Sequence, residues 1–273
     1  MAFKKTVGLK LVMTAAAAII FLPVAAPSWA QSNSTQSAPP AAPQKESAAS
    51  AKTALPTADQ VLDHYVQATG GHDAWKKITS RVSKGTVDVP AMNLNGTIEL
   101  HEKAPNDMIA TVMIGGAAFV QAYDGKVAWS NDPQNGLREM SDGELDETRR
   151  DSDFYRPLDI KNLYPKIAIT GVEKIGEHDA YVLDAHDAEG ADAEKMYFDT
   201  QSGLLVRDIS QRHMADGVSP VQVDFSDYRI VDGIKLPFSM HQLAGGNEFT
   251  ITMSEVQQNV NVDDAEFAKP AAQ

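Results

Sequence analysis

Apolar and polar residues alternate along most of the chain. This period of two is typical of β-strands, because successive side chains of a strand point to opposite faces of a sheet. In residues 234–243, for example, Ile234, Leu236 and Met240 share one face. The connections between such pieces are short, which favours an antiparallel meander. The pieces are 82–89, 94–102, 108–114, 118–123, 127–131, 167–175, 181–186, 195–199, 204–210, 221–231, 234–243 and 249–256. They predict a mainly β (α+β) domain with about eleven or twelve strands.

The dipeptide Asp-Gly joins two pairs of these pieces, at residues 124–125 and 232–233. It supplies the positive φ angles that a two-residue type I′ turn requires, so both positions predict β-hairpins. The first hairpin, registered about its turn, pairs Ala122 with Val127 and Val120 with Trp129. One face of that hairpin is then wholly apolar.

Helical spacing is confined to three places. Before the first strand, Thr57 and Gln60 form a capping box, and Gly70 and Gly71 end the helix. The apolar face of this helix consists of Val61, Leu62, Tyr65 and Val66. Two more helical pieces are predicted at residues 73–78 and at the highly charged residues 141–153, where Ser141 and Glu144 form a second capping box.

The first thirty residues are typical of an export signal. Lys4, Lys5 and Lys10 precede an uncharged run over residues 11–24, and the Ser-Trp-Ala of residues 28–30 places small side chains where signal peptidase reads them. An uncleaved membrane anchor is the alternative, but the run is shorter than the roughly 20 residues that span a bilayer. We therefore expect cleavage after Ala30, a periplasmic location and no integral membrane span in the mature form.

The composition of the rest of the chain predicts a linker followed by a domain, and it excludes several classes of function. Residues 31–55 are mostly Ala, Ser, Pro, Gln, Thr and Asn, which bury too little to offset the entropy of ordering, so we expect a disordered linker before a single domain at 56–273. The formal charge is −13, and without residues 1–30 it is −16, with 21 basic against 37 acidic residues. Such acidity disfavours nucleic-acid binding. The lack of cysteine excludes disulfides, thiolate metal sites and a lipidated cysteine.

Five segments together carry a resemblance to a known family, through their order and spacing. They are YVQATGG (65–71), YDGKVAW (123–129), YFDTQSGLLVR (197–207), DYRIVDGIKLP (227–237) and FAKP (267–270). With these segments the chain resembles the bacterial outer-membrane lipoprotein-sorting superfamily, which includes the periplasmic lipoprotein carrier and its outer-membrane receptor. The resemblance implies a strongly curved, unclosed antiparallel sheet, or half-open β-barrel, with helices over its concave face. It also implies a hydrophobic cavity for acyl chains, no enzymatic activity, no cofactor and no metal.

A carrier of acyl chains needs a large apolar concavity and a cover that moves, since each methylene removed from water contributes roughly 0.8 kcal/mol. Residues 108–114 are largely apolar on both faces, as a strand covered on both sides would be. The predicted cavity lining is Met92, Leu94, Ile98, Leu100, Ile109, Met113, Val120, Trp129, Phe238 and Met240. The predicted cover is Leu62, Tyr65 and Trp75. The alternative for each of these residues is an ordinary place in the core.

Sequence motifs give no support for an enzyme. The nucleophile elbow, the phosphate-binding P-loop and the zinc-protease helix motif are all absent. None of the seven histidines forms a pair at metal-ligand spacing on a predicted helix: His64, His72, His101, His178, His186, His213 and His241. The densest acidic stretch is Asp184, Asp187, Glu189, Asp192 and Glu194. Its spacing matches no calcium loop, so we interpret it as a solvated hairpin loop.

Three functional hypotheses remain open. The first is a soluble periplasmic, non-catalytic binding protein for a lipid, a lipoprotein acyl chain or another amphiphile, with a possible role in outer-membrane lipoprotein sorting. The second is an envelope sensor or interaction protein of the same fold, whose protein partner depends on residues 141–153. The third is a hydrolase whose site has no recognisable motif. The first hypothesis implies a lipid or an acylated protein as the partner, and the second implies an envelope protein.

Overall fold

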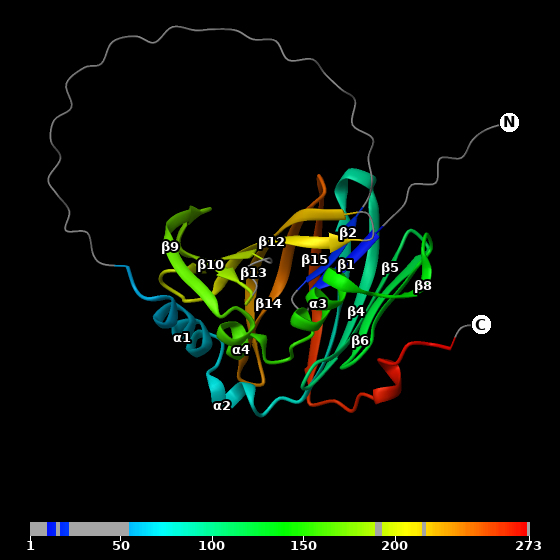
Figure 1. Cartoon of the computed structure of the whole chain (residues 1–273), viewed down its shortest axis with the longest axis horizontal. Helices are drawn as coiled ribbons and strands as arrows, with labels where there is room; N and C mark the ends of the chain where they lie inside the picture. Colours follow the sequence, from blue (N-terminus) through cyan, green and yellow to red (C-terminus); the bar gives the residue numbers. More distant parts are fainter. Residues whose placement is uncertain (1–9, 15–16, 22–54, 189–192, 215–216, 272–273) are drawn as a thin grey trace, which may run out of the picture.

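The computed structural model describes residues 10–14, 17–21, 55–188, 193–214 and 217–271. Within them, thirteen strands form one antiparallel sheet, which is curled and unclosed (Figure 1). Twelve of the strands coincide with the pieces predicted from alternation, and β8 is the one without a predicted counterpart. The strands are β3 (Ser80–Val89), β4 (Leu94–Lys103), β5 (Asp107–Ile114), β6 (Ala117–Asp124), β7 (Ala128–Asp132), β8 (Gly136–Glu139), β9 (Lys166–Ile175), β10 (His178–His186), β11 (Ala193–Asp199), β12 (Leu205–Met214), β13 (Gly217–Val231), β14 (Ile234–Ala244) and β15 (Asn247–Gln258).

The order of the strands explains why helices cover the hollow face. Sequence neighbours pair throughout, except that β3 pairs with β15, so the sheet runs from β8 at one edge through β3 and β15 to β9 at the other. The two edge strands β8 and β9 are therefore consecutive along the chain, and the segment between them must cross from edge to edge. That segment carries α3 (Asp142–Asp151) and α4 (Arg156–Leu163), and α3 lies within the curve of the sheet (Figure 1).

The opening helices α1 (Ala58–Ala68) and α2 (His72–Trp75) lie beside α4. The predicted capping box of α1 is confirmed, because Gln60 N donates to Thr57 Oγ1 at 3.2 Å and Thr57 N donates to Gln60 Oε1 at 2.9 Å. The second predicted capping box is wrong: Ser141 is the N-cap of α3 but makes no side-chain cap bond, and Glu144 pairs with Arg138 instead. Helix α4 has no counterpart in the predictions.

Strand alternation sorts the side chains of the main sheet into an inner and an outer face. In β5, Met108, Ala110, Val112 and Ile114 face inward and are at most 3% exposed. They belong to the largest apolar cluster, which also includes residues of β3, β4, β6 and β13–β15. A second cluster packs α1 and α4 against the inner face of β9–β11. Helices α1 and α4 therefore share an apolar cluster with one part of the inner face.

The two predicted Asp-Gly hairpins have different outcomes. At residues 232–233 both φ angles are positive and Val231 pairs with Ile234, so the two-residue turn is confirmed. At residues 124–125 the connection is longer, because Tyr123 pairs with Ala128. The Asp124 carboxylate accepts hydrogen bonds from the backbone amides of residues 126 and 127. The predicted pairing of Ala122 with Val127 and Val120 with Trp129 is therefore wrong. The pairs are Ala122 with Trp129 and Val120 with Asn131.

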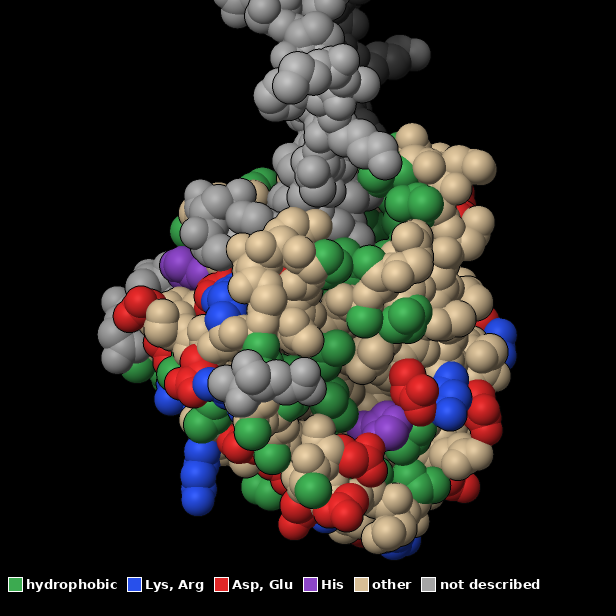
Figure 2. All heavy atoms as spheres, turned by 90° about the vertical axis from the view of Figure 1, so that its right-hand side faces the viewer, with side chains coloured by type: hydrophobic (Ala, Val, Ile, Leu, Met, Phe, Trp, Pro, Cys, Tyr) green, Lys and Arg blue, Asp and Glu red, His purple; other side chains and the backbone are tan. Residues whose placement is uncertain are grey.

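After β15 the chain crosses the outer face of β4 to β8. Trp129 Nε1 donates to the carbonyl oxygen of Phe267 at 2.8 Å, and Lys103 Nζ donates to the carbonyl oxygen of Val262 at 3.1 Å. His101 of β4 pairs with Glu266 of the crossing segment, and Lys269 of that segment pairs with Glu139 of β8. Acidic and basic side chains are interspersed over the described part of the adjoining surface (Figure 2). This C-terminal segment, residues 259–271, buries Trp129 on the side of the sheet opposite the hollow.

Two segments of the predicted leader also have described backbone. Strands β1 (Lys10–Thr14) and β2 (Ala17–Phe21) pair as a separate antiparallel hairpin that contacts β6, β14, β15 and α3. Cleavage after Ala30 stays a prediction, and residues 31–54 of the predicted linker lie outside the described residues. Among the described residues, none of the helices has the length and hydropathy to cross a membrane.

Candidate ligand-binding cavity

A cavity of about 140 Å³ lies between the inner face of the sheet and the helices. Its apolar wall comes from strands β4, β11, β13, β14 and β15, whose inward positions alternate with outward polar ones. This wall consists of Ile98, Leu100, Met196, Val221, Val223, Phe225, Met240 and Met253. Tyr65 of α1 and Trp75 of α2 close part of the opposite side. The result is a mostly apolar hollow between the sheet and the helices α1–α4, which together form its lid.

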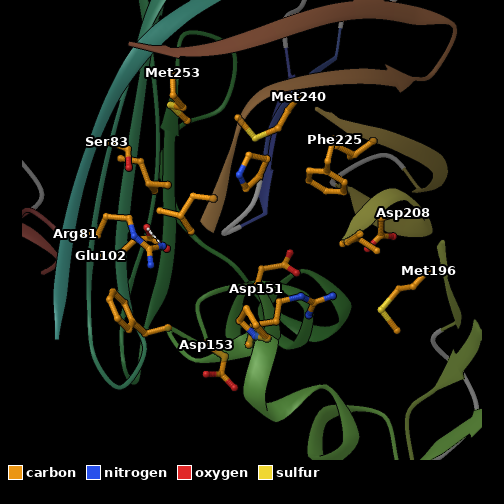
Figure 3. Close-up of a pocket in the computed structure, with 18 of the residues that line it drawn as sticks. Arg81, Ser83, Glu102, Asp151, Asp153, Met196, Asp208, Phe225, Met240 and Met253 are labelled. Carbon is orange, nitrogen blue, oxygen red and sulfur yellow. Dashed lines mark hydrogen bonds and ion pairs between the residues drawn. The ribbon is translucent and has the colours of Figure 1, made fainter. Parts of the chain in front are cut away.

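The cavity also has a charged end, which the sequence interpretation missed. Figure 3 shows Arg81 and Glu102 on one wall, Asp208 on the opposite wall, and Asp151 and Asp153 beside α3. Arg81 Nη1 lies 3.2 Å from Glu102 Oε2, and the Arg81 guanidinium carbon lies 5.0 Å from the centre of the Phe154 ring. Both members of this ion pair are buried. Burial raises the pKa of Glu102, and the attraction of Arg81 only partly offsets it.

A second ion pair ties α3 to β12. Arg212 Nη1 lies 2.7 Å from Asp151 Oδ2, and both residues are buried. Burial raises the pKa of Asp151, against the pull of Arg212. One turn earlier in α3, the buried Glu147 accepts hydrogen bonds from the backbone N of His213 at 2.9 and 3.0 Å and contacts its Nδ1 at 2.7 Å. Polar contacts to neighbouring residues of β12 therefore hold this helix in the hollow.

A third set of polar contacts, centred on the Glu194 carboxylate, joins α4 to β11 and β12. Arg156 Nη2 and the Tyr164 hydroxyl both donate to the Glu194 carboxylate, which also hydrogen-bonds the Asp208 side chain. Burial is the largest single effect on Glu194 and opposes its ionisation, but Arg156, the hydrogen bond with Asp208 and Arg212 together hold the pKa of Glu194 below its usual range. Burial and the adjacent Glu194 raise the pKa of Asp208 well above its ordinary value of 3.8. The neutral form is therefore favoured at Asp208 and the ionised form at Glu194.

The predicted site residues fall into three groups. Ile98, Leu100, Met240, Tyr65 and Trp75 line the cavity. Met92, Leu94, Phe238 and Leu62 pack in the adjoining apolar clusters without lining it. Ile109, Met113, Val120 and Trp129 lie on the outer face, since β5 and β6 turn Val112 and Phe119 inward. Whether any of them contacts a ligand stays a prediction.

The charged end had a signal in the sequence that the motif search did not use. Arg81 has the same strand phase as Val87 and Val89, and Glu102 has the phase of Ile98 and Leu100. A charge in the apolar phase of a strand points into the core, where it needs a partner. Glu194 was assigned to a solvated acidic loop, but it is buried at the start of β11, so that part of the interpretation is wrong. Residues 189–192 of the same stretch lie outside the described residues.

Comparison with known proteins places the fold in a class. No family model and no curated protein matches the sequence. The unclosed curved sheet with helices over its hollow face is the fold of outer-membrane lipoprotein-sorting proteins, as the five sequence segments predicted.

Three crystal structures share this fold, and the region similar to this chain spans nearly the whole length of each of them. A DUF1329 family protein from Desulfovibrio piger is 17% identical, with a TM-score of 0.52 over 77% of this chain and 96% of its own. A putative outer membrane lipoprotein-sorting protein domain from Vibrio parahaemolyticus is 11% identical, with a TM-score of 0.50 over 77% and 95%. A LolA superfamily protein from Nitrosomonas europaea is 14% identical, with a TM-score of 0.50 over 79% and 99%. At these identities the likeness concerns the fold.

Proposed function

We propose that the protein is a non-catalytic binding protein that holds the apolar part of a lipid, a lipoprotein acyl chain or another amphiphile in this cavity. The observation that carries the proposal is the apolar wall under a lid of helices. Each methylene that enters such a wall from water contributes roughly 0.8 kcal/mol. The similarity in fold to a lipoprotein-sorting domain supports the same class of ligand. Together with the predicted export signal, this similarity also supports a periplasmic carrier in outer-membrane lipoprotein sorting.

The size of the cavity limits how a ligand binds. A dry engineered cavity of about 150 Å³ is known to hold one benzene molecule. The cavity of about 140 Å³ therefore accepts a ring or a short piece of an acyl chain while the helices stay in place. A whole chain enters only if the cover moves away from the sheet. The segment from α3 to α4 suits that motion, since it is joined to the sheet's two edge strands at its ends and crosses the hollow between them.

Filling the cavity tests the proposal. Ser83 is buried and lines the cavity, whereas the next residue of β3, Lys84, is exposed on the outer face. Ser83→Phe places a ring in the hollow, so we expect the affinity for N-phenyl-1-naphthylamine, an uncharged apolar fluorophore, to fall at least about tenfold. Extra volume in a packed site costs about 1–3 kcal/mol of stability, so the melting temperature of each variant is measured first.

Lys84→Phe is the matched control, with the same new ring on the same strand. It should bind the fluorophore like the wild type. A folded Ser83→Phe variant with unchanged fluorophore affinity would contradict a binding role for the cavity.

A further inference from the structure

The charged end of the cavity contains hydrogen-bond donors that the protein itself does not use. Arg81 is 8% exposed, and only its Nη1 atom is paired, with Glu102. Its Nε and Nη2 atoms are buried and have no hydrogen-bond partner among the described residues, and the same holds for Nη1 of Arg156. A buried donor without a partner is unfavourable, because it has lost its hydrogen bonds to water and gained none within the protein. These nitrogens belong to Arg81 of β3 and Arg156 of α4, two residues that line the cavity on the sheet and on the helices.

The charges that line the cavity balance. Three ion pairs, Arg81–Glu102, Arg156–Glu194 and Arg212–Asp151, are each neutral as a pair. Of the other ionisable lining residues, the half-buried Lys235 and Asp153 carry opposite charges. Asp208 is also half-buried, and burial of its carboxyl beside Glu194 favours its neutral form. An incoming carboxylate or phosphate would therefore meet no surplus cation. It would also lie close to the Glu102 and Glu194 carboxylates that the arginines already bind.

We propose that the cavity binds an amphiphile of the acylglycerol class, with an uncharged head whose ester or hydroxyl oxygens accept hydrogen bonds from Arg81 and Arg156. This inference rests on the proposed function and names its ligand class. The acyl chain lies against Met240 and Phe225, and the head reaches the spare N–H groups. A neutral acceptor satisfies those donors without disturbing the charge balance. A free fatty acid adds a charge that nothing in the described lining compensates.

Calorimetric titration of the protein, purified from the periplasm without detergent and delipidated, tests the head-group preference. The ligands are 1-monolauroylglycerol, laurate and dodecylamine, which share one chain length, each used below its micelle concentration at pH 7.5. We expect 1-monolauroylglycerol to bind at least about tenfold more tightly than either charged ligand. Laurate or dodecylamine binding equally well or better would overturn the inference while leaving the proposed function intact. Failure of all three to bind would overturn both.

Substitutions of Arg81 test whether this residue causes the preference for 1-monolauroylglycerol. Arg81→Met/Glu102→Leu removes a buried ion pair together, an exchange that is often neutral for stability. It should reduce the preference for 1-monolauroylglycerol over laurate to less than about threefold. Arg81→Lys keeps the charge opposite Glu102 but loses the guanidinium group with its spare Nε and Nη2 donors, so it should weaken the preference in the same direction even if the double variant does not fold.

The control is Arg207→Met/Asp224→Leu, which removes a similar cross-strand ion pair that does not line the cavity. It should keep the full preference. A folded Arg81 variant that also keeps the full preference would overturn the assignment of the donors.

Discussion

Asp208 and Glu194 show how a single side chain in the cavity couples protonation to folding. Burial and the neighbouring Glu194 raise the pKa of Asp208 well above 3.8, so the folded protein holds a proton that the unfolded chain releases above about pH 4. Stability therefore decreases as the pH rises from that value through the folded-state pKa of Asp208. The slope is at most about 1.4 kcal/mol per pH unit for one proton.

Asp208→Asn should remove this contribution, because the amide is neutral at every pH. In urea unfolding at pH 5, 6, 7 and 8, we expect the free energy of unfolding of the variant to rise relative to the wild type as the pH increases. A difference that does not change with pH would contradict the proton on Asp208.

Glu194→Gln is the matched comparison. Arg156 holds the pKa of Glu194 below its usual range, so this carboxylate contributes stability that is fully present above the unfolded pKa of about 4.5. In the Asp208→Asn background, which removes the titration of Asp208, Glu194→Gln should lower the free energy of unfolding by a nearly constant amount between pH 5 and 8. The two neighbouring carboxyls are thus expected to give different pH dependences.

Much of the fold at the level of single residues could be predicted, but the pairing of buried charges could not. Alternation puts Ile98 and Leu100 in one strand phase and Met240 in the apolar phase of its own strand, and all three face the cavity, because strand phase is a local property. An apolar phase does not say which face of a sheet the helices cover, so alternation alone could not assign Trp129 to the outer face. The C-terminal segment that covers Trp129 arrives from 138 residues away. Partners such as Arg212 and Asp151 come from different elements, so no spacing in the sequence reports them.

Helix α3 is the element whose position depends most on polar contacts. Its buried residues are Glu147, Thr148 and Asp151, and none is apolar. The Arg212–Asp151 ion pair and the contact of Glu147 with His213 therefore fix it against β12. Replacing one member of a buried pair leaves the other charge unpaired, which costs about 3–5 kcal/mol.

Arg212→Met should accordingly lower the free energy of unfolding by about 3 kcal/mol. It should also accelerate hydrogen exchange of the α3 amides more than that of the α1 amides, whose helix packs through an apolar face. Arg149→Met on the same helix removes an exposed pair with Asp146 and should change stability by less than about 0.5 kcal/mol. Equal effects of the two substitutions would show that the buried pair does not hold the helix.

Helices were harder to predict than strands for a physical reason. The α1 stripe of Val61, Leu62 and Tyr65 is apolar and contiguous, and it could be recognised directly. Helix α4 spans only eight residues, begins at Arg156 and Pro157, and buries Ile160 alone, so it has little periodicity. Its place follows from topology, since the chain must cross between the two edge strands.

At the scale of the whole molecule, one curved sheet does two things. Its inner face supplies an apolar wall, and its two edges, β8 and β9, force the connecting segment across the hollow. The charged residues that line the cavity come from β3, β4, α3, α4, β11, β12 and β14 and from the α3–α4 connection, so they meet only when the sheet has curled. Folding and the making of the cavity are therefore the same event, and a ligand that fills the cavity should stabilise the whole sheet.

The central claim is that this cavity holds an acyl lipid. The most direct measurement is mass spectrometry of an organic extract of the protein, purified without detergent, beside the same extract of Ser83→Phe. We predict an acyl lipid in near-equimolar amount from the wild type and much less from Ser83→Phe. An extract without lipid, from wild-type protein that also fails to bind N-phenyl-1-naphthylamine, would contradict the claim.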